Sequence, residues 1–169
     1  PGGPDVQAML LTAFGNIYRS LGHHDDACRV LAAAVAERRG RAVRDDSIVV
    51  ASAGGLPGEL HKLWRARGVG TYHVEYGYSC MGYEIAGGLG VKLAHPGREV
   101  IVLVGDGSYL MMNSEIATSV ALDRPITIVV ADNRGFGCIH RLARRVGAPS
   151  FANLIDEGPV IDFVAHARS

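Results

Sequence analysis

The sequence predicts an α/β fold in which a parallel sheet carries helices on both faces and is preceded by an α-helical hairpin. Two observations lead to this prediction. Three short, β-branched and continuously apolar runs, at residues 48–51, 100–104 and 126–130, have the composition of strands buried on both faces. Helical segments at about 81–94 and 112–122 separate these runs, and each is long enough for a right-handed crossover.

The composition limits the classes of protein to be considered. The chain has 169 residues, 48% of them hydrophobic, and 17 Lys and Arg balance 17 Asp and Glu, as in ordinary globular proteins. A formal charge of zero gives no reason to expect nucleic acid or an anionic membrane as a partner. Three scattered cysteines without a C-x-x-C pair fit a reducing cytoplasm, and no apolar run approaches the length of a membrane span. We therefore expect a cytoplasmic protein.

Residues 8–39 are predicted to form the helical hairpin, because apolar residues recur at spacings of three and four on both sides of a polar break at 23–26. Five residues resemble positions of a single tetratricopeptide repeat: Leu11, Phe14, Tyr18, Ala27 and Leu31. One such unit cannot bury its apolar face, since these arrays need about three repeats for stability. A repeat array cut off at residue 1 and an unrelated hairpin both remain open.

The chain divides near residue 45. Residues 38–46 show no hydrophobic period and have the charged composition of a linker. We therefore assign residues 1–44 to the hairpin and linker, and residues 45–169 to a second domain whose C-terminal end is expected to be truncated.

The predicted helix over residues 82–94 contains four glycines, which together cost about 3–4 kcal/mol relative to alanine. Close approach of another backbone is expected to offset this cost. Gly82, Ala86 and Gly90 share one face at a spacing of four. Contact with another subunit and a tight contact within the chain are both compatible with this pattern.

Polar and glycine clusters follow each predicted strand, at the carboxyl edge where parallel sheets bind ligands. After the second strand, the turn 105–108 aims free N–H groups of a helix start at an anion, yet it also contains Asp106. A carboxylate repels a bound phosphate unless a cation lies between them. We therefore expect Mg²⁺ between Asp106 and a diphosphate, with the amide oxygen of Asn133 and a backbone carbonyl of its turn as further ligands.

The Gly-Asp-Gly turn followed by Asn133 at the end of the next strand resembles the cofactor motif of thiamine-diphosphate-dependent enzymes. Three segments, 54–64, 72–84 and 132–139, look like the branch of that family that opens a cyclic 1,2-dione in inositol catabolism. The resemblance covers roughly residues 45–151. It implies the thiamine-diphosphate-binding fold, thiamine diphosphate and Mg²⁺ as cofactors, and a hydrolase acting on C–C bonds. An acetolactate-synthase-like or decarboxylase-like activity shares these cofactor residues and remains an alternative.

The same resemblance implies roles for particular residues. Asp106, Asn133 and the carbonyl of Gly135 are the expected magnesium ligands, and Met81 is expected to support the two rings of the cofactor. The expected cofactor-binding residues are Gly54, Gly55, Leu56, Ser79, Met81, Gly105, Asp106, Gly107, Ser108, Asn133, Gly135 and Phe136. The candidates for hydrogen bonds to a polyhydroxylated ring are His73, Glu75, Tyr76 and Tyr78.

The catalytic residues cannot be assigned from this chain. In the family, the activating Glu comes from a separate pyrimidine-binding domain, usually of a partner subunit, and no such domain is recognisable here. The resemblance therefore implies a partner domain or a homo-oligomer, with a small cyclic dione as substrate. A noncatalytic protein, in which the hairpin mediates contacts and the cofactor domain is a remnant, is the alternative from a different class.

Overall fold

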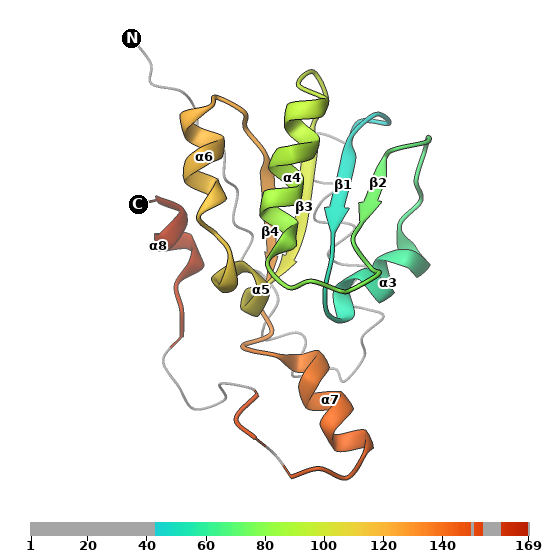
Figure 1. Cartoon of the computed structure of the whole chain (residues 1–169), viewed down its shortest axis with the longest axis vertical. Coiled ribbons are helices and arrows are strands. Elements are labelled where there is room, and N and C mark those ends of the chain that lie inside the picture. Colours follow the sequence, from blue (N-terminus) through green and yellow to red (C-terminus); the bar gives the residue numbers. More distant parts are fainter. Residues whose placement is uncertain (1–42, 150, 154–159, 169) are drawn as a thin grey trace.

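The computed structural model describes residues 43–149, 151–153 and 160–168 (Figure 1). The predicted hairpin over residues 8–39 lies outside these ranges, so the boundary proposed near residue 45 stays a prediction. The helices and strands run in the order β1 Ile48–Ala51, α3 Gly55–Leu63, β2 Tyr72–Val74, α4 Tyr83–Ala94, β3 Val100–Gly105, α5 Asp106–Met111, α6 Glu115–Ala121, β4 Thr127–Ala131, α7 Gly137–Arg145 and α8 Phe163–Arg168. Within the described ranges, no helix has the length and apolar character needed to cross a bilayer.

The four strands form one parallel sheet in the order β2-β1-β3-β4, and their carboxyl ends point to the edge where α3, α5 and α7 lie (Figure 1). The register pairs Val49 with Ile101 and Val102 with Ile128. From β1 the chain passes outward to β2 and then returns across β1 to β3. The loops after β1 and β3 therefore lead away from each other, which opens a crevice at the carboxyl edge.

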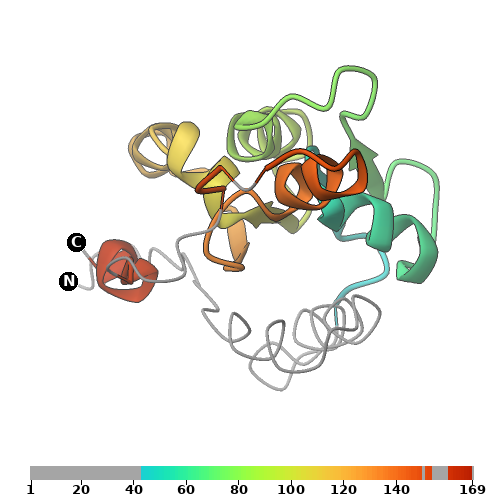
Figure 2. The same cartoon turned by 90° about the horizontal axis from the view of Figure 1, so that it is seen from below.

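Alternate side chains of the strands build two hydrophobic layers. On one face, Val102 and its neighbours pack against Ile85 of α4, Tyr109 of α5 and Phe163 of α8. On the other face, Ile101 belongs to a cluster that includes Leu60 of α3. The view along the sheet in Figure 2 shows α3 and α4 on opposite sides. The predicted α/β fold with helices on both faces is confirmed.

The predicted strands agree with β1, β3 and β4 to within one residue. The helix expected at 112–122 corresponds to α6, and the separate short helix α5 precedes it directly after β3. Several of these elements were not predicted, among them β2 and α3. β2 has only three residues, all half-buried, so it has no continuous apolar run. α3 begins in a glycine pair and contains Pro57 and Gly58, which weaken any helical signal.

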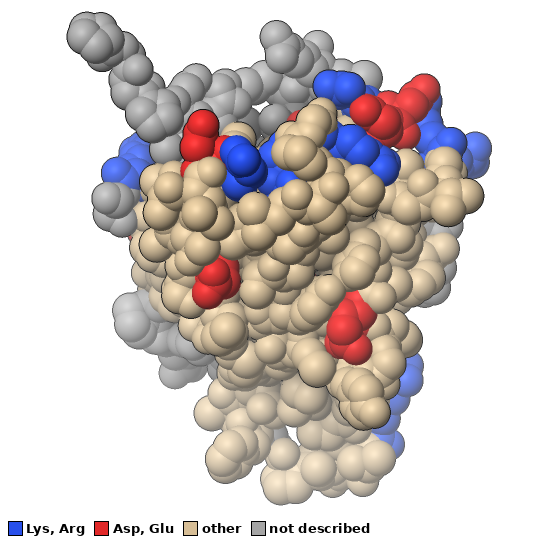
Figure 3. All heavy atoms as spheres, turned by 45° about the horizontal axis from the view of Figure 1, so that its top comes forward, with Lys and Arg blue, Asp and Glu red and all other residues tan. Residues whose placement is uncertain are grey.

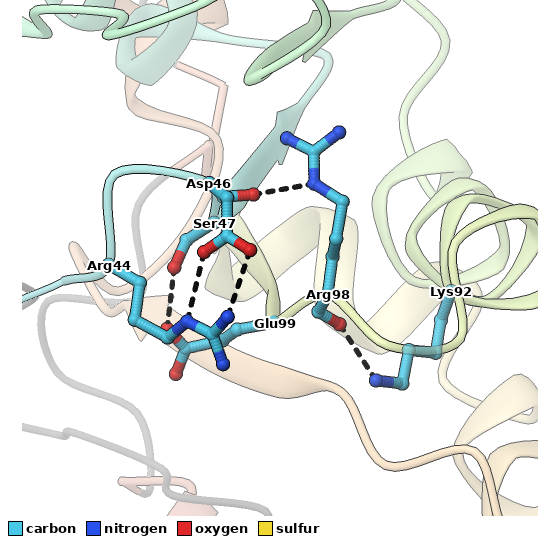
Figure 4. Close-up of polar contacts among 6 residues, drawn as sticks. All are labelled: Arg44, Asp46, Ser47, Lys92, Arg98 and Glu99. Carbon is cyan, nitrogen blue, oxygen red and sulfur yellow. Dashed lines mark hydrogen bonds and ion pairs between the residues drawn. The ribbon is translucent and has the colours of Figure 1, made fainter.

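A group of charged residues fixes the opposite edge, where the strands begin (Figure 4). The hydroxyl of Ser47 donates to Glu99 at 2.7 Å, and Arg98 Nε donates to the carbonyl of Asp46 at 2.6 Å. The Lys92 ammonium, at the end of α4, donates to the carbonyl of Arg98 at 2.8 Å. These bonds tie the start of β1 to the start of β3 and to α4. The register of the two central strands is therefore held far from the cavity described below.

Within the described part of the chain, α4 approaches the sheet most closely at Gly88. A Cβ on Gly88 would collide with Cγ2 of Val102 on β3. Gly82 caps the helix with φ 89°, and a Cβ there would lie 2.7 Å from Met112. Gly90, by contrast, has nothing within 4 Å of its Cβ position. The glycine at 88 therefore lets α4 lie directly on the sheet.

We expect Gly88→Ala to destabilise the chain by about 1–3 kcal/mol, because the added methyl group overpacks a rigid strand contact. Gly90→Ala is the matched control in the same helix, and it should stabilise by about 0.5–1 kcal/mol through the better helix propensity of alanine. Urea unfolding of both variants measures the difference. If Gly90→Ala instead destabilises the chain, and does so more strongly at higher protein concentration, then Gly90 contacts a second subunit.

Candidate functional site

A cavity of about 370 Å³ lies at the carboxyl edge of the sheet, between the turns that follow β1, β3 and β4 and the start of α7. The structure brings all twelve of the predicted cofactor-binding residues to the wall of this one cavity. They come from the loop at 54–56, the loop at 79–81, the turn at 105–108 and the turn at 133–136. Their individual roles stay predictions.

Asp106 and Asn133 meet between two strand ends. Asp106 is the first residue of α5, and Asn133 lies two residues beyond β4, the neighbouring strand. The backbone N–H of Gly135 donates to Oδ2 of Asp106 at 2.6 Å and so links the two turns. The other carboxylate oxygen, Oδ1, lies 3.1 Å from the side-chain amide of Asn133. The backbone N–H groups of Gly107 and Asn133 also donate to this carboxylate.

The side-chain amide of Asn133 faces two acceptors. One of its outer atoms lies 2.7 Å from the carbonyl oxygen of Gly135 and 3.1 Å from Oδ1 of Asp106. If this atom is the nitrogen, the amide donates to both oxygens. If it is the oxygen, three oxygens face one another, and a cation among them is needed to relieve the repulsion. In an octahedral Mg²⁺ site, neighbouring ligand oxygens lie about 3.0 Å apart. Both separations at Asn133 are close to this distance.

The types of atom also fit magnesium. In the part of the chain that the structure describes, no three His, Cys, Asp or Glu side chains gather in a group suited to a metal ion. An ion between the two turns would have one carboxylate, one amide and one backbone carbonyl as its protein ligands. Such an all-oxygen set is typical of Mg²⁺ rather than Zn²⁺, and it leaves coordination positions for phosphate and water.

Asp106 is 5% exposed, and the charge of its carboxylate is costly in this position. Burial and the nearby charge of Asp132 raise the pKa of Asp106 to about 6, although the N–H of Gly135 favours the charged form. A cation beside the carboxylate would compensate both effects. The chemistry of the site therefore favours a bound positive ion at neutral pH.

The turn after β4 owes its shape to its own residues. Oδ1 of Asp132 accepts a hydrogen bond of 2.8 Å from the N–H of Arg134, a local bond that favours turns. Arg134 and Gly135 both have positive φ, at 63° and 139°. The N–H of Phe136 then donates to the carbonyl of Asn153 at 2.7 Å. This geometry directs the carbonyl of Gly135 and the amide of Asn133 to the same point.

Phe136 covers the turn after β3. A Cβ on Gly107 would lie 2.7 Å from the ring of Phe136, so only glycine at 107 leaves room for this contact. The two turns are therefore held together by the packing of Phe136 on Gly107 as well as by the hydrogen bond from Gly135 to Asp106. Phe136 is 38% exposed and forms part of the cavity wall.

Glu84 does not line the cavity but bonds to residues that do, a role that the sequence did not reveal. It is 1% exposed, and its carboxylate accepts from the hydroxyl of Ser108 at 2.7 Å and from the N–H of Ala53 at 3.3 Å. The N–H of Gly82 donates to the oxygen of Ser108 at 2.7 Å. One buried carboxylate therefore connects the loop after β1, the start of α4 and the turn after β3. The only signal in the sequence was an acidic residue inside an apolar helical stretch.

This network limits the role of Ser108. Its single hydroxyl proton is given to Glu84, and the side chain is 4% exposed. The hydroxyl is thus not free to donate to a phosphate. Any contribution of Ser108 to an anion would come from its backbone.

The loop that carries Ser79 and Met81 is held by Glu75. The carboxylate of Glu75 accepts from the N–H groups of Tyr78 at 3.0 Å and Cys80 at 2.8 Å. These bonds hold the pKa of Glu75 below its usual value. Ser79 itself has φ 52°, a left-handed conformation that such bonds help to maintain.

The candidates for binding a polyhydroxylated ring do not line the cavity. His73 forms a hydrogen bond with the hydroxyl of Tyr83 at 2.6 Å, and the carboxylate of Glu75 accepts hydrogen bonds from the backbone of its own loop. Tyr76 packs against His61, and Tyr78 is almost fully exposed. Their contact with a substrate ring stays a prediction.

The first turns of α7 supply cavity residues that were not predicted. These are Gly137, Cys138, Ile139, Arg141 and Leu142. They were missed because α7 is short and strongly basic, with no apolar run that marks a helix beginning at Gly137. Among the described residues, Cys138 and Cys80 are free thiols.

A family comparison defines the class of protein. Residues 52–169 match the family described as "Thiamine pyrophosphate enzyme, C-terminal TPP binding domain". This chain therefore belongs to the thiamine pyrophosphate enzymes, through their C-terminal cofactor-binding domain. The resemblance predicted from the Gly-Asp-Gly turn and Asn133 is confirmed.

More similar relatives are known within this family. Over 109 residues, the chain is 51% identical to the 3D-(3,5/4)-trihydroxycyclohexane-1,2-dione hydrolase of Bacillus subtilis (strain 168) and 54% identical to the protein of that name from Bacillus licheniformis. The matches cover 64% of this chain, and the chain spans only 17% of the length of these curated relatives. The predicted resemblance to the dione-opening branch is confirmed.

A solved structure supports the fold. The thiamine diphosphate-dependent 4-hydroxybenzoylformate decarboxylase of Rhodococcus jostii RHA1 superimposes with a TM-score of 0.68, covering 84% of this chain and 25% of that chain. The two sequences are 23% identical. At this identity, the comparison concerns the fold and carries no argument about the reaction.

Proposed function

We propose that this chain is the thiamine diphosphate- and Mg²⁺-binding part of a cytoplasmic enzyme that cleaves a C–C bond of a cyclic 1,2-dione. The identity of 51–54% with trihydroxycyclohexanedione hydrolases supports this substrate class. Membership in the thiamine pyrophosphate enzymes supports the cofactor.

The observation that carries the metal proposal is the convergence of the Asn133 side-chain amide on the carbonyl oxygen of Gly135 and on Oδ1 of Asp106. We propose that these three residues hold Mg²⁺ in the cavity. Thiamine diphosphate supplies an electron sink for cleaving the bond next to a carbonyl group. Gly54, Gly105 and the other predicted lining residues leave space and backbone groups for the diphosphate.

The remaining wall residues orient the cofactor and exclude water. Leu56, Met81, Phe136 and Leu142 give the cavity an apolar side. Met81 is 36% exposed, so it stands at the rim, where a flexible apolar side chain can pack against an aromatic ring. We propose that it supports the cofactor rings.

A further domain or second copy of the chain is proposed to complete the site. Figure 3 shows that charges on the face carrying α4 and α6 gather near the amino ends of the strands, while the rest is largely uncharged. Large apolar side chains near the cavity are exposed, namely Tyr78, Met81, Leu110, Met111 and Met112. Such an apolar surface is suited to a protein interface. The pyrimidine-binding domain with the activating Glu is proposed to cover it.

Calorimetry of the chain with thiamine diphosphate tests the cofactor proposal. We expect binding in the presence of Mg²⁺ and none with a chelator, because the ion offsets the repulsion between Asp106 and phosphate. Absence of binding under both conditions would support the alternative of a noncatalytic interaction protein.

Assays with the natural enzyme that contains this sequence test the substrate. We expect hydrolysis of the trihydroxycyclohexane-1,2-dione and no turnover of pyruvate. Turnover of pyruvate alone would favour the alternative of an acetolactate-synthase-like or decarboxylase-like enzyme. The 169-residue chain by itself should show little dione hydrolysis, and substantial hydrolysis without a partner contradicts the need for a second domain.

A further inference from the structure

One basic side chain reaches the cavity. Of the cavity-lining residues in the described part of the chain, Arg141 is the single Lys or Arg. Its guanidinium lies against Gly55, because a Cβ on that glycine would be 2.7 Å from Nη2. Nη1 lies 3.6 Å from the Cβ position of Gly137. Arg141 therefore extends from α7 toward the start of α3, across the loop that follows β1.

The guanidinium of Arg141 has no hydrogen-bond acceptor among the described residues, whereas several arginines away from the cavity have one. Arg44 pairs with Asp46, Arg67 pairs with Asp45, and Arg98 bonds to a backbone carbonyl. A guanidinium carries five N–H donors in a planar fork. Placing this fork on the wall of a cavity, half-buried and without an acceptor, is favourable only if a ligand or water receives its bonds.

The charges of the cavity suggest which ligand this is. Its wall carries two carboxylates, Asp106 and Asp132, and one guanidinium, Arg141. A divalent ion would neutralise the two carboxylates and leave no excess charge for an anion. Arg141 supplies that excess. A guanidinium also matches the geometry of phosphate oxygens better than an ammonium does.

We infer that Arg141 is an additional anion ligand of this cavity and binds the diphosphate group of the cofactor. The inference rests on the proposed function and adds a charged side chain to a site otherwise built from a metal ion and backbone groups. Gly55 belongs to the same arrangement, since a side chain at 55 would displace the guanidinium.

Titration of the 169-residue chain with inorganic pyrophosphate in the presence of Mg²⁺ tests this inference. Pyrophosphate has no rings, so its binding does not require a pyrimidine-binding domain. We expect Arg141→Met to weaken binding by about 10- to 100-fold, the usual effect of losing a charge-assisted hydrogen bond. The affinity of Arg141→Lys should fall between those of the parent chain and Arg141→Met, and Gly55→Ala should weaken binding by a smaller factor than Arg141→Met does. Arg144→Met, an exposed change on the same helix, is the control and should bind as the parent chain does.

The outcomes separate the two claims. Equal binding by the parent chain and Arg141→Met, with thermal unfolding unchanged, overturns the role of Arg141 and leaves the proposed function intact. A parent chain that binds neither Mg²⁺–pyrophosphate nor Mg²⁺–thiamine diphosphate overturns both. If Arg141→Met unfolds, Arg141→Lys decides the question, because it keeps the stem and the charge but loses the fork. Equal losses in Arg141→Met and Arg144→Met would show a general charge effect and contradict a specific ligand.

Discussion

Asp106→Ala is expected to abolish Mg²⁺-dependent binding of thiamine diphosphate, with a loss of affinity of about 100-fold or more. The reason is geometric as well as electrostatic. Asp106 gives one carboxylate oxygen to the N–H of Gly135 and leaves the other facing Asn133. Alanine removes the charged ligand and the bond that joins the two turns. Calorimetry at a fixed excess of Mg²⁺, compared with the parent chain, measures the loss.

Asp132→Asn is the matched control for this experiment. Asp132 lines the same cavity, but its carboxylate accepts a bond from Arg134 within its own turn. An amide oxygen can accept that bond equally well, so a change of less than about tenfold is expected. If Asp106→Ala binds the cofactor as tightly as Asp132→Asn does, the metal site is not where we place it.

Asp106→Asn should stabilise the metal-free chain by about 2–3 kcal/mol at pH 7.5, because each unit of pKa shift corresponds to about 1.4 kcal/mol. The pKa of Asp106 rises from 3.8 to about 6 on folding. Between these values the folded chain holds more protons than the unfolded chain, so stability falls as the pH rises through this window. Asparagine does not titrate. The gain in unfolding free energy of Asp106→Asn over the parent chain should therefore be near zero at about pH 4 and reach a plateau above about pH 7.

Urea unfolding in a chelator, at several pH values, measures this advantage. Asp45→Asn serves as the control, because Asp45 is exposed and forms a surface ion pair with Arg67. The unfolding free energy of Asp45→Asn should differ from that of the parent chain by no more than about 0.5 kcal/mol at every pH. An Asp106→Asn chain that is less stable than its parent at pH 7.5 would mean that the carboxylate is already compensated without a metal ion.

The strands of the central sheet and the walls of the cavity were predictable from the sequence for a physical reason. Runs such as Val100–Val104 are buried on both faces, so every residue is apolar and the signal is continuous. Parallel strands also end at a common edge, so that Asp106 and Asn133 meet although they are distant in the chain. The resemblance of this motif to a known family then suggested the roles that we propose for them.

The remaining features depend on contacts that no local pattern records. Glu84 stands in an apolar stretch and bonds to the cavity wall only because Ser108 and Ala53 come to it from other segments. Gly88 was one of four glycines in a helix, and its specific need for a hydrogen side chain arises from Val102. Arg141 lies on a short helix whose polar composition gave no sign that it faces a cavity.

The side chain of Asn133 can serve the molecule in two states. With its nitrogen turned inward, it bridges Gly135 and Asp106 and keeps the two turns together before any ion arrives. If the proposed Mg²⁺ binds there, a half-turn of the amide presents the oxygen at the same point, and the bridge becomes a ligand. Loading the proposed site would then require one bond rotation instead of rebuilding a loop. Metal capture should accordingly leave the backbone of both turns where it already stands.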